Sequence, residues 1–164
     1  MAEETPKGRE PRILLALALS LVALLGVDLG PKSDAFTYLM ETFPVLLGAP
    51  LLVATRRRFP LTPLVYRRLF VHACVLVVGG HWTYADVPAG NWVRDQFGLA
   101  RNPYDRLGHF LQGFVPALVA REVLLRTSPL RPGGWLSFLT VAVCVAISAA
   151  YEFNVGGKAK MMTF

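Results

Sequence analysis

Residues 69–84 read LFVHACVLVVGGHWTY, and here an apolar run typical of a membrane helix ends in polar and aromatic residues. A polar stretch follows, with HWTYADVPAGNWVRD at 81–95 and RNPYDRLGHF at 101–110, before a second apolar run begins at 107. Charge at the rim of a bilayer is costly and usually has a purpose. The sequence therefore predicts membrane helices joined by a polar segment, and this segment is where a functional site is expected.

Composition supports a membrane protein over a soluble domain. Of the 164 residues, 54% are hydrophobic and 17% are charged, and the apolar residues come in runs. A soluble chain of this length would leave most of these runs exposed to water. The net charge of +6 comes from basic residues beside apolar runs, which is the pattern of topology signals. We expect the lipid bilayer as a partner and no nucleic acid.

The fold class predicted is all-α: a polytopic transmembrane helix bundle with the N-terminus inside. Bilayer-exposed backbone must satisfy its own hydrogen bonds, and each run is close to the roughly 20 residues that a crossing helix needs. A tail at 1–11 precedes the helical domain at 12–153, and an atypical tail at 154–164 follows it. The expected five spans lie near 12–29, 36–55, 68–84, 107–125 and 135–153.

Orientation follows from the basic residues. With the N-terminus inside, most of the 17 Lys and Arg residues fall on the inner side, and the triplet Arg56-Arg57-Arg58 is the strongest signal. The first span could instead be a signal peptide, but no small-x-small cleavage site follows it. Aromatic residues of the outer segments, among them Tyr84, Trp92 and Tyr104, fit an interfacial belt.

Depth and orientation together bring ionisable residues from all five spans to one membrane face. His72 is the exception, near the inner end of the third span, and its spacing of nine residues from His81 puts the two on opposite helix faces. The residues that gather at the outer face are Asp28, Glu41, His81, Asp105, His109 and Glu152.

Two interpretations of this cluster stay open. In the first, His81, Asp105 and His109 form a catalytic or divalent-metal site, because two imidazoles and a carboxylate match common zinc sets with a position left for water. Asp105 and His109 are four residues apart and share one helix face. In the second, the same residues form a satisfied polar network that caps helices and fixes the loop. Supporting residues expected in either case are Glu41, Tyr84, Arg101, Asn102, Arg106 and Glu152.

Three classes of function follow from these interpretations. The first is a metal-dependent membrane enzyme acting on a lipid or a small substrate, and the second is a binding or transport protein. The third is a structural membrane protein without catalysis. Transport ranks below binding, since the inner halves of the spans offer little polarity beyond His72. The residues alone do not decide whether the chain is an enzyme.

The stretch from Phe43 to Glu152 resembles the YjdF-like family of uncharacterised bacterial inner-membrane proteins. The resemblance rests on GGHWTYADVPAGNWVRDQFGLARNPYDRLGHF, which starts at Gly79, on FPVLLGAPLL at 43–52, and on RRFPLTP at 57–63. It implies a multi-pass inner-membrane protein and no particular reaction. Family members continue past Glu152 with a further acidic stretch and helix, whereas this chain ends in FNVGGKAKMMTF, so we expect a truncated or frameshifted product.

Overall fold

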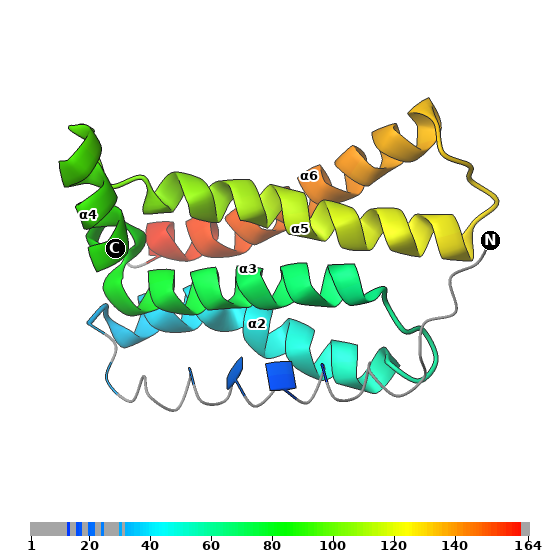
Figure 1. The fold of residues 1–164 in the computed structure, drawn as a ribbon, viewed down its shortest axis with the longest axis horizontal. Coiled ribbons are helices and arrows are strands. Elements are labelled where there is room, and N and C mark those ends of the chain that lie inside the picture. The colour runs from blue at the N-terminus through cyan, green and yellow to red at the C-terminus, as the bar shows by residue number, and fades with distance from the viewer. Residues whose placement is uncertain are drawn as a thin grey trace. The chain divides into compact units, whose positions relative to one another are not determined.

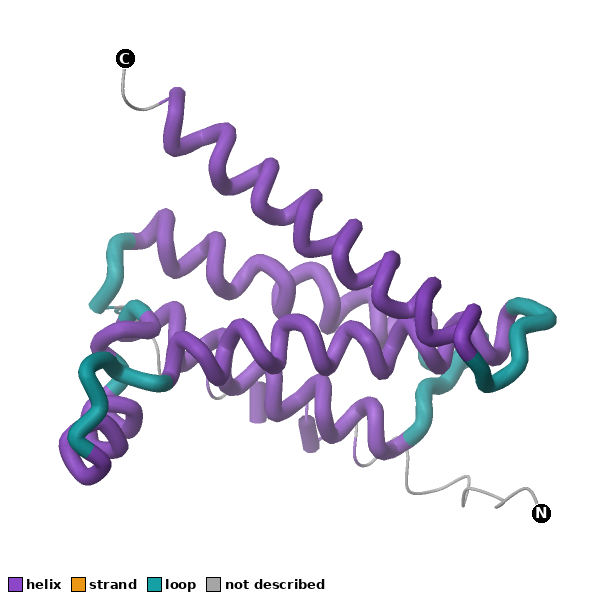
Figure 2. Tube along the Cα trace, turned by 90° about the horizontal axis from the view of Figure 1, so that it is seen from above, coloured by secondary structure: helices purple, strands orange, loops and turns teal. Residues whose placement is uncertain are grey.

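The computed structural model describes residues 13, 16, 17, 20, 21, 24, 30 and 32–161, with side chains described up to residue 150. All regular elements among these residues are helices (Figure 2), which confirms the all-α class. Two compact units are distinguished, Met1–Gly108 and His109–Phe164, and α5 runs from the first into the second. The elements in chain order are α2 (Ala35–Thr55), α3 (Pro63–Trp82), the 3-10 helix η1 (Tyr84–Asp86), α4 (Pro88–Phe97), α5 (Tyr104–Thr127) and α6 (Gly134–Met161) (Figure 1).

Both long helices of the first unit begin at clear start signals. Asp34 is the N-cap of α2, and one carboxylate oxygen accepts from the backbone N–H of Thr37 at 3.0 Å. Thr62 precedes α3 and Pro63 occupies its first turn, where a missing N–H costs nothing. This Thr-Pro start places the beginning of α3 ahead of the predicted span at 68–84.

The core of the first unit lies between α2 and α3, which run side by side (Figure 1). Val45 of α2 and Leu76 and Val77 of α3 form a buried cluster. Leu21 and Leu24, two described residues of the predicted first span, pack against it. The rest of that span, like the tail at 1–11, lies outside the described residues.

A glycine lets α2 and α3 approach closely at one end. A Cβ atom built on Gly80 would lie 3.0 Å from the Cβ of Glu41 and 3.4 Å from the ring of Tyr38. Any larger side chain would have to push the two helices apart, because atoms in a packed interior have little room to move. Gly80 therefore fixes the spacing of α2 and α3 beside the carboxylate-bearing Glu41.

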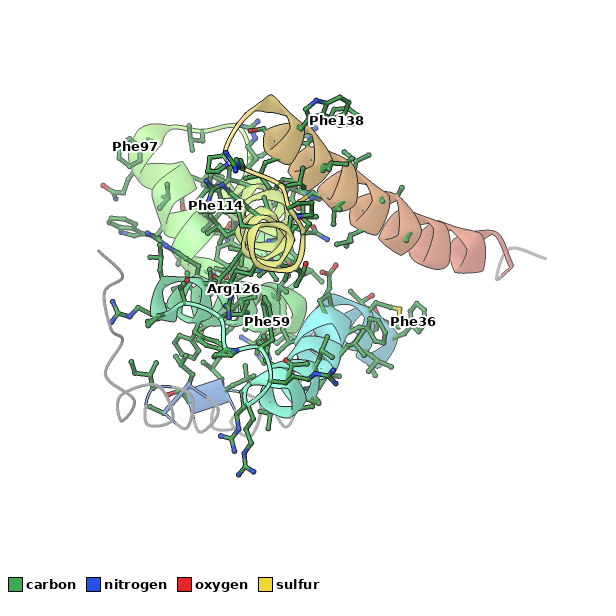
Figure 3. All side chains as sticks on the ribbon, turned by 90° about the vertical axis from the view of Figure 1, so that its right-hand side faces the viewer. Phe36, Phe59, Phe97, Phe114, Arg126 and Phe138 are labelled. Carbon is green, nitrogen blue, oxygen red and sulfur yellow. The ribbon has the colours of Figure 1, made fainter. Side chains whose placement is uncertain are left out.

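The outward faces of these helices are apolar, as expected in lipid. Both α2 and α3 are long and apolar enough to cross a membrane, at about 1.5 Å of rise per residue. Only 11% of the apolar window of α2 is buried. In water such a surface would strongly favour association. The exposed apolar residues of α2 are Phe36 (labelled in Figure 3), Leu39, Phe43, Leu46, Leu47, Leu51 and Val53.

The second unit contains most of α5 and all of α6. On α5 the rings of Phe110 and Phe114 stack one turn apart, with centroids 5.5 Å from each other. The stretch Gly134–Ala150 of α6 is apolar, and its backbone continues as a helix to Met161, past the end predicted at 153. The ends of the membrane spans and the inside position of the N-terminus stay predictions.

The close approach at Gly80 can be tested with a matched pair of glycines. Gly80→Leu overpacks the α2–α3 contact and should destabilise the protein by about 1–3 kcal/mol, seen as a lower thermal unfolding midpoint in detergent. Gly48→Leu is the control, since a Cβ atom at Gly48 meets nothing within 4 Å. Equal midpoints for the two variants would contradict the packing described here.

Candidate functional site

The candidate site lies at one end of the first unit, where α3 ends and α2 and α5 begin; we call this the polar end. Its base is the C-terminus of α3, whose last carbonyls need partners outside the helix. The backbone N–H groups of Lys32 and Ser33 both donate to the carbonyl of His81 at 3.0 Å. The Ser33 hydroxyl donates to the carbonyl of Gly80 at 2.5 Å. The segment before α2 thus closes the end of α3.

His81 lies half-buried at this closed end. Its imidazole meets the ring of Trp82 edge-on, with centroids 4.1 Å apart and planes at 67°. The Nζ atom of Lys32 lies 5.1 Å from the centroid of the Trp82 ring, in the arrangement of a cation–π contact. The imidazole of the predicted site histidine therefore contacts an aromatic ring, and this ring in turn lies beside a cation.

The turn after α3 holds an unusual backbone conformation at Thr83. Its φ of 56° makes it the one non-glycine residue with positive φ in the described chain, and a β-branched residue is rarely found there. The Thr83 hydroxyl donates to Asp86 Oδ2 at 3.1 Å, and the Asp86 N–H donates to the Thr83 carbonyl at 2.8 Å. Asp86 thus stabilises the turn through both its carboxylate and its backbone N–H.

Tyr84 follows this turn and inserts its ring between two helices. A Cβ atom on Gly79 of α3 or on Gly108 of α5 would lie 2.5 Å from a Tyr84 ring carbon. The ring also packs against Tyr104, at a centroid distance of 5.9 Å, and the Tyr104 hydroxyl donates to the Val75 carbonyl at 3.1 Å. Tyr84 and Tyr104, expected in an interfacial belt, therefore join the end of α3 to the start of α5.

Asn102 joins the next two elements. Its Nδ2 donates to the carbonyl of Val87 and to Asn91 Oδ1, both at 3.0 Å, while its Oδ1 accepts from the N–H of Tyr104 at 2.9 Å. The side chain lies directly against Gly90, where a Cβ atom would overlap it. Asn102 therefore clamps the first turn of α4 to the start of α5.

A short helix occupies a stretch that the sequence analysis treats as loop. Pro88 opens α4, and Gly98, with φ of 60°, ends it in the left-handed conformation typical of a helix C-cap. Between them Arg94 donates to Asn91 Oδ1 at 3.1 Å and pairs with Asp95 at 2.8 Å. This ion pair raises the pKa of Arg94, chiefly through the hydrogen bond to Asp95.

A hydrogen bond also changes the pKa of Asp34, the N-cap of α2 at the polar end. The Thr37 hydroxyl donates to the Asp34 carboxylate, and this bond is the main cause of the lowered pKa of Asp34, followed by the bond from the Thr37 backbone. The N-cap of α2 therefore stays ionised to lower pH than a free aspartate. Its support for the helix is present above the pKa of a free aspartate and is lost as pH falls through the lowered value.

The predicted site residues divide into three groups. Glu41, His81, Tyr84 and Asn102 belong to the first unit and are half-buried. Asp105, Arg101 and Arg106 belong to the same unit and are exposed, while His109, one helical turn after Asp105 on α5, is exposed and opens the second unit. The side chain of Glu152 lies outside the described part of the chain.

The candidate donor atoms of the described residues do not form a metal cage. Among the described residues, no group of three or more His, Cys, Asp or Glu side chains could hold a metal ion. Imidazole and carboxylate are still the groups that polar ligands and metals use. The site hypothesis therefore rests on how the polar end is constructed and not on a recognisable ligand set.

Apolar helices of membrane length, joined at a hydrogen-bonded polar end, define a multi-pass helical membrane protein. Residues 12–154 match the family DUF2238, described as a predicted membrane protein, and the chain belongs to this family. A relative, the inner membrane protein YjdF of Escherichia coli (strain K12), is 51% identical over 143 residues, which cover 87% of this chain and 68% of the relative. No solved structure matches the chain. Family and helices agree on a multi-pass membrane protein, and the name of the relative places that relative in the inner membrane.

Several residues of the polar end carry no obvious signal of their role in the sequence. Lys32 and Ser33, which close α3, precede a helix and look like an ordinary linker. Asn91 and Arg94 belong to α4, a helix that the apolar pattern does not predict. Local signals did exist, since Pro88 and Gly98 bracket α4 and Asn-Pro at 102–103 is a common turn pair.

The Asn102 clamp predicts a local effect. Asn102→Ala removes three hydrogen bonds, so α4 should open more often, and its amide hydrogens should exchange about tenfold faster. Exchange measured by mass spectrometry on the peptide covering α4 checks this. Gln96→Ala alters an exposed residue of the same helix and serves as control. If both variants exchange like the parent chain, Asn102 is not a clamp.

Proposed function

We propose that this protein binds a polar ligand at its polar end, and that His81, Glu41 and Asp105 contact that ligand. The ligand class is a small polar molecule or a lipid headgroup. The proposal concerns binding and assigns no reaction.

The observation that carries the proposal is the backbone of Thr83. A non-glycine residue held at positive φ costs of order 1–3 kcal/mol, and such residues cluster at ligand sites and active sites. Here the strained residue stands two positions after His81 and three before Asp86, and hydrogen bonds hold it. A purely structural turn at this position could use glycine without strain.

The chemistry of the surrounding groups supports a polar ligand. Glu41 lies against Gly80, the residue before His81, so a carboxylate of α2 and an imidazole of α3 belong to the same end of the unit. Asp105 stands in the first turn of α5, the helix that Tyr84 joins to α3. Carboxylates accept hydrogen bonds, and imidazole both donates and accepts, so the set suits a ligand that carries N–H or O–H groups.

A divalent metal is the second ligand that these groups could take, and a metal-dependent enzyme is the corresponding second hypothesis. The donor types fit zinc, and His109 follows Asp105 by one turn of α5. The lack of a three-residue cage among the described side chains makes metal the weaker choice. Metal analysis belongs in the same experiment for this reason.

The test measures ligand-dependent stability of the purified chain in detergent. The probes are phosphatidylethanolamine, phosphatidylglycerol, cardiolipin, zinc chloride and magnesium chloride, each added alone. A ligand at 100 times its Kd stabilises by about 2.7 kcal/mol and raises the unfolding midpoint. We expect one probe to raise the midpoint of the parent chain, and the rise to be lost in His81→Ala and in Asp105→Ala.

The third histidine provides the control. His72 is buried in α3, nine residues before His81, and His72→Gln should keep the ligand-induced rise. Stoichiometric zinc that is lost in both His81→Ala and His109→Ala would make metal the ligand. Variants that lower the midpoint but respond to every probe like the parent chain would contradict the proposal and favour a structural role.

A further inference from the structure

The helix α4 exposes its aromatic side chains and buries part of its polar side, the reverse of a helix on a protein surface in water. Its exposed large apolar side chains are Trp92, at 63%, and Phe97, at 73%, and Leu99 just beyond the helix is 41% exposed. Its inward side carries Gly90, which is buried, and Asn91, which is half-buried. A soluble helix buries the aromatic side and exposes the amide side.

The large apolar side chains and the hydrogen-bonded side chains lie on different arcs of the helix, although the exposed Gln96 lies within the apolar arc. At 100° per residue, Trp92, Val93 and Phe97 occupy an arc of about 140°. Gly90, Arg94 and Asn91 lie in an arc of about 100° elsewhere on the helix, and two of these, Arg94 and Asn91, join the hydrogen-bond network of Asn102. The exposed apolar arc is therefore a consequence of how the clamp orients α4.

The chain path sets the depth at which α4 lies. The membrane helix α3 ends at Trp82, and α4 begins at Pro88 after a single 3-10 turn. Val87, directly before α4, is 1% exposed, so the start of the helix is packed onto the polar end. A helix attached this closely to the end of a membrane span begins at the boundary between lipid and water.

From these observations we infer that α4 lies in the interface of the bilayer, with Trp92 and Phe97 inserted among the lipids at the headgroup boundary. Tryptophan is enriched at this depth because its ring is amphipathic. A short amphipathic helix lying in the plane of the membrane buries its apolar side in the same zone. The Arg94–Asp95 pair at 2.8 Å offsets one charge against the other, which lowers the cost of that position.

The inference adds a lipid-contacting surface that is linked to the polar end. Asn102 bonds to Asn91 and Val87 at the start of α4 and to Tyr104 at the start of α5. Lipids that contact Trp92 therefore touch an element that is hydrogen-bonded to the site region. The inference does not depend on the proposed ligand, since it follows from exposure and chain path alone.

A single-tryptophan chain tests the position of α4. Trp82→Phe combined with Trp135→Phe leaves Trp92 as the reporter, in vesicles of phosphatidylethanolamine and phosphatidylglycerol with or without bromine on the upper part of the acyl chains. We expect brominated lipid to remove most of the Trp92 emission, and aqueous acrylamide to quench it weakly. A second chain, with Phe97→Trp and the three native tryptophans changed to Phe, should behave alike.

Two results would overturn the inference. Strong acrylamide quenching without lipid quenching would put the helix in water. Resistance to both quenchers would mean that protein covers α4, from a second copy or from another part of the chain. The Phe97→Trp chain places the reporter at a second position of α4, which guards against a result peculiar to the site of Trp92.

Discussion

The polar end depends on one packing contact, the ring of Tyr84 between Gly79 and Gly108. Three segments meet at this ring: the last turns of α3, the 3-10 turn η1 and the first turns of α5. A Cβ atom at either glycine would overlap the ring, so the contact exists only because both residues lack one. The capped end of α3, the strained Thr83 and the Asn102 clamp are all arranged around it.

This contact explains why a polar segment between two membrane helices can be ordered. A flexible loop at the membrane surface would let water reach every side chain, and its histidines and acids would have little influence on one another. Here α3 is closed by Lys32 and Ser33, and α4 is fixed by Asn102. The groups proposed to bind a ligand are thus attached to rigid elements, which preserves their geometry when the ligand is absent.

Much of the fold could be predicted from the sequence because long apolar runs indicate membrane helices. The run at 36–55 became α2 almost residue for residue, and an Asp before it and a Thr-Pro before α3 marked their starts. The helix α4 is not predicted because it has only ten residues and is polar on average, so it does not stand out from the polar stretch around it. An exposed tryptophan is unusual on a protein surface in water, whereas in a membrane protein it is expected where the surface meets lipid.

The sequence predicts where polar residues gather, but it does not predict which contacts each of them makes. The depths of the ionisable residues in the predicted spans indicate the polar end, since charged residues near a bilayer are costly and usually have a function. Depth alone could not tell a ligand-contacting group from a scaffold group. Tyr84 and Asn102, expected as supporting residues, form the scaffold through contacts that depend on Gly79, Gly90 and Gly108 and that no residue spacing predicts.

The most direct test of this account is the energetic coupling between Tyr84 and Gly108. Gly108→Ala should lower the unfolding midpoint of the parent chain, although alanine favours a helix over glycine by about 1 kcal/mol. In a Tyr84→Ala background the ring is gone, so the same change should be neutral or stabilising, and the double-mutant cycle should show strong coupling. An equal loss of stability in both backgrounds would contradict the claim that this contact organises the polar end.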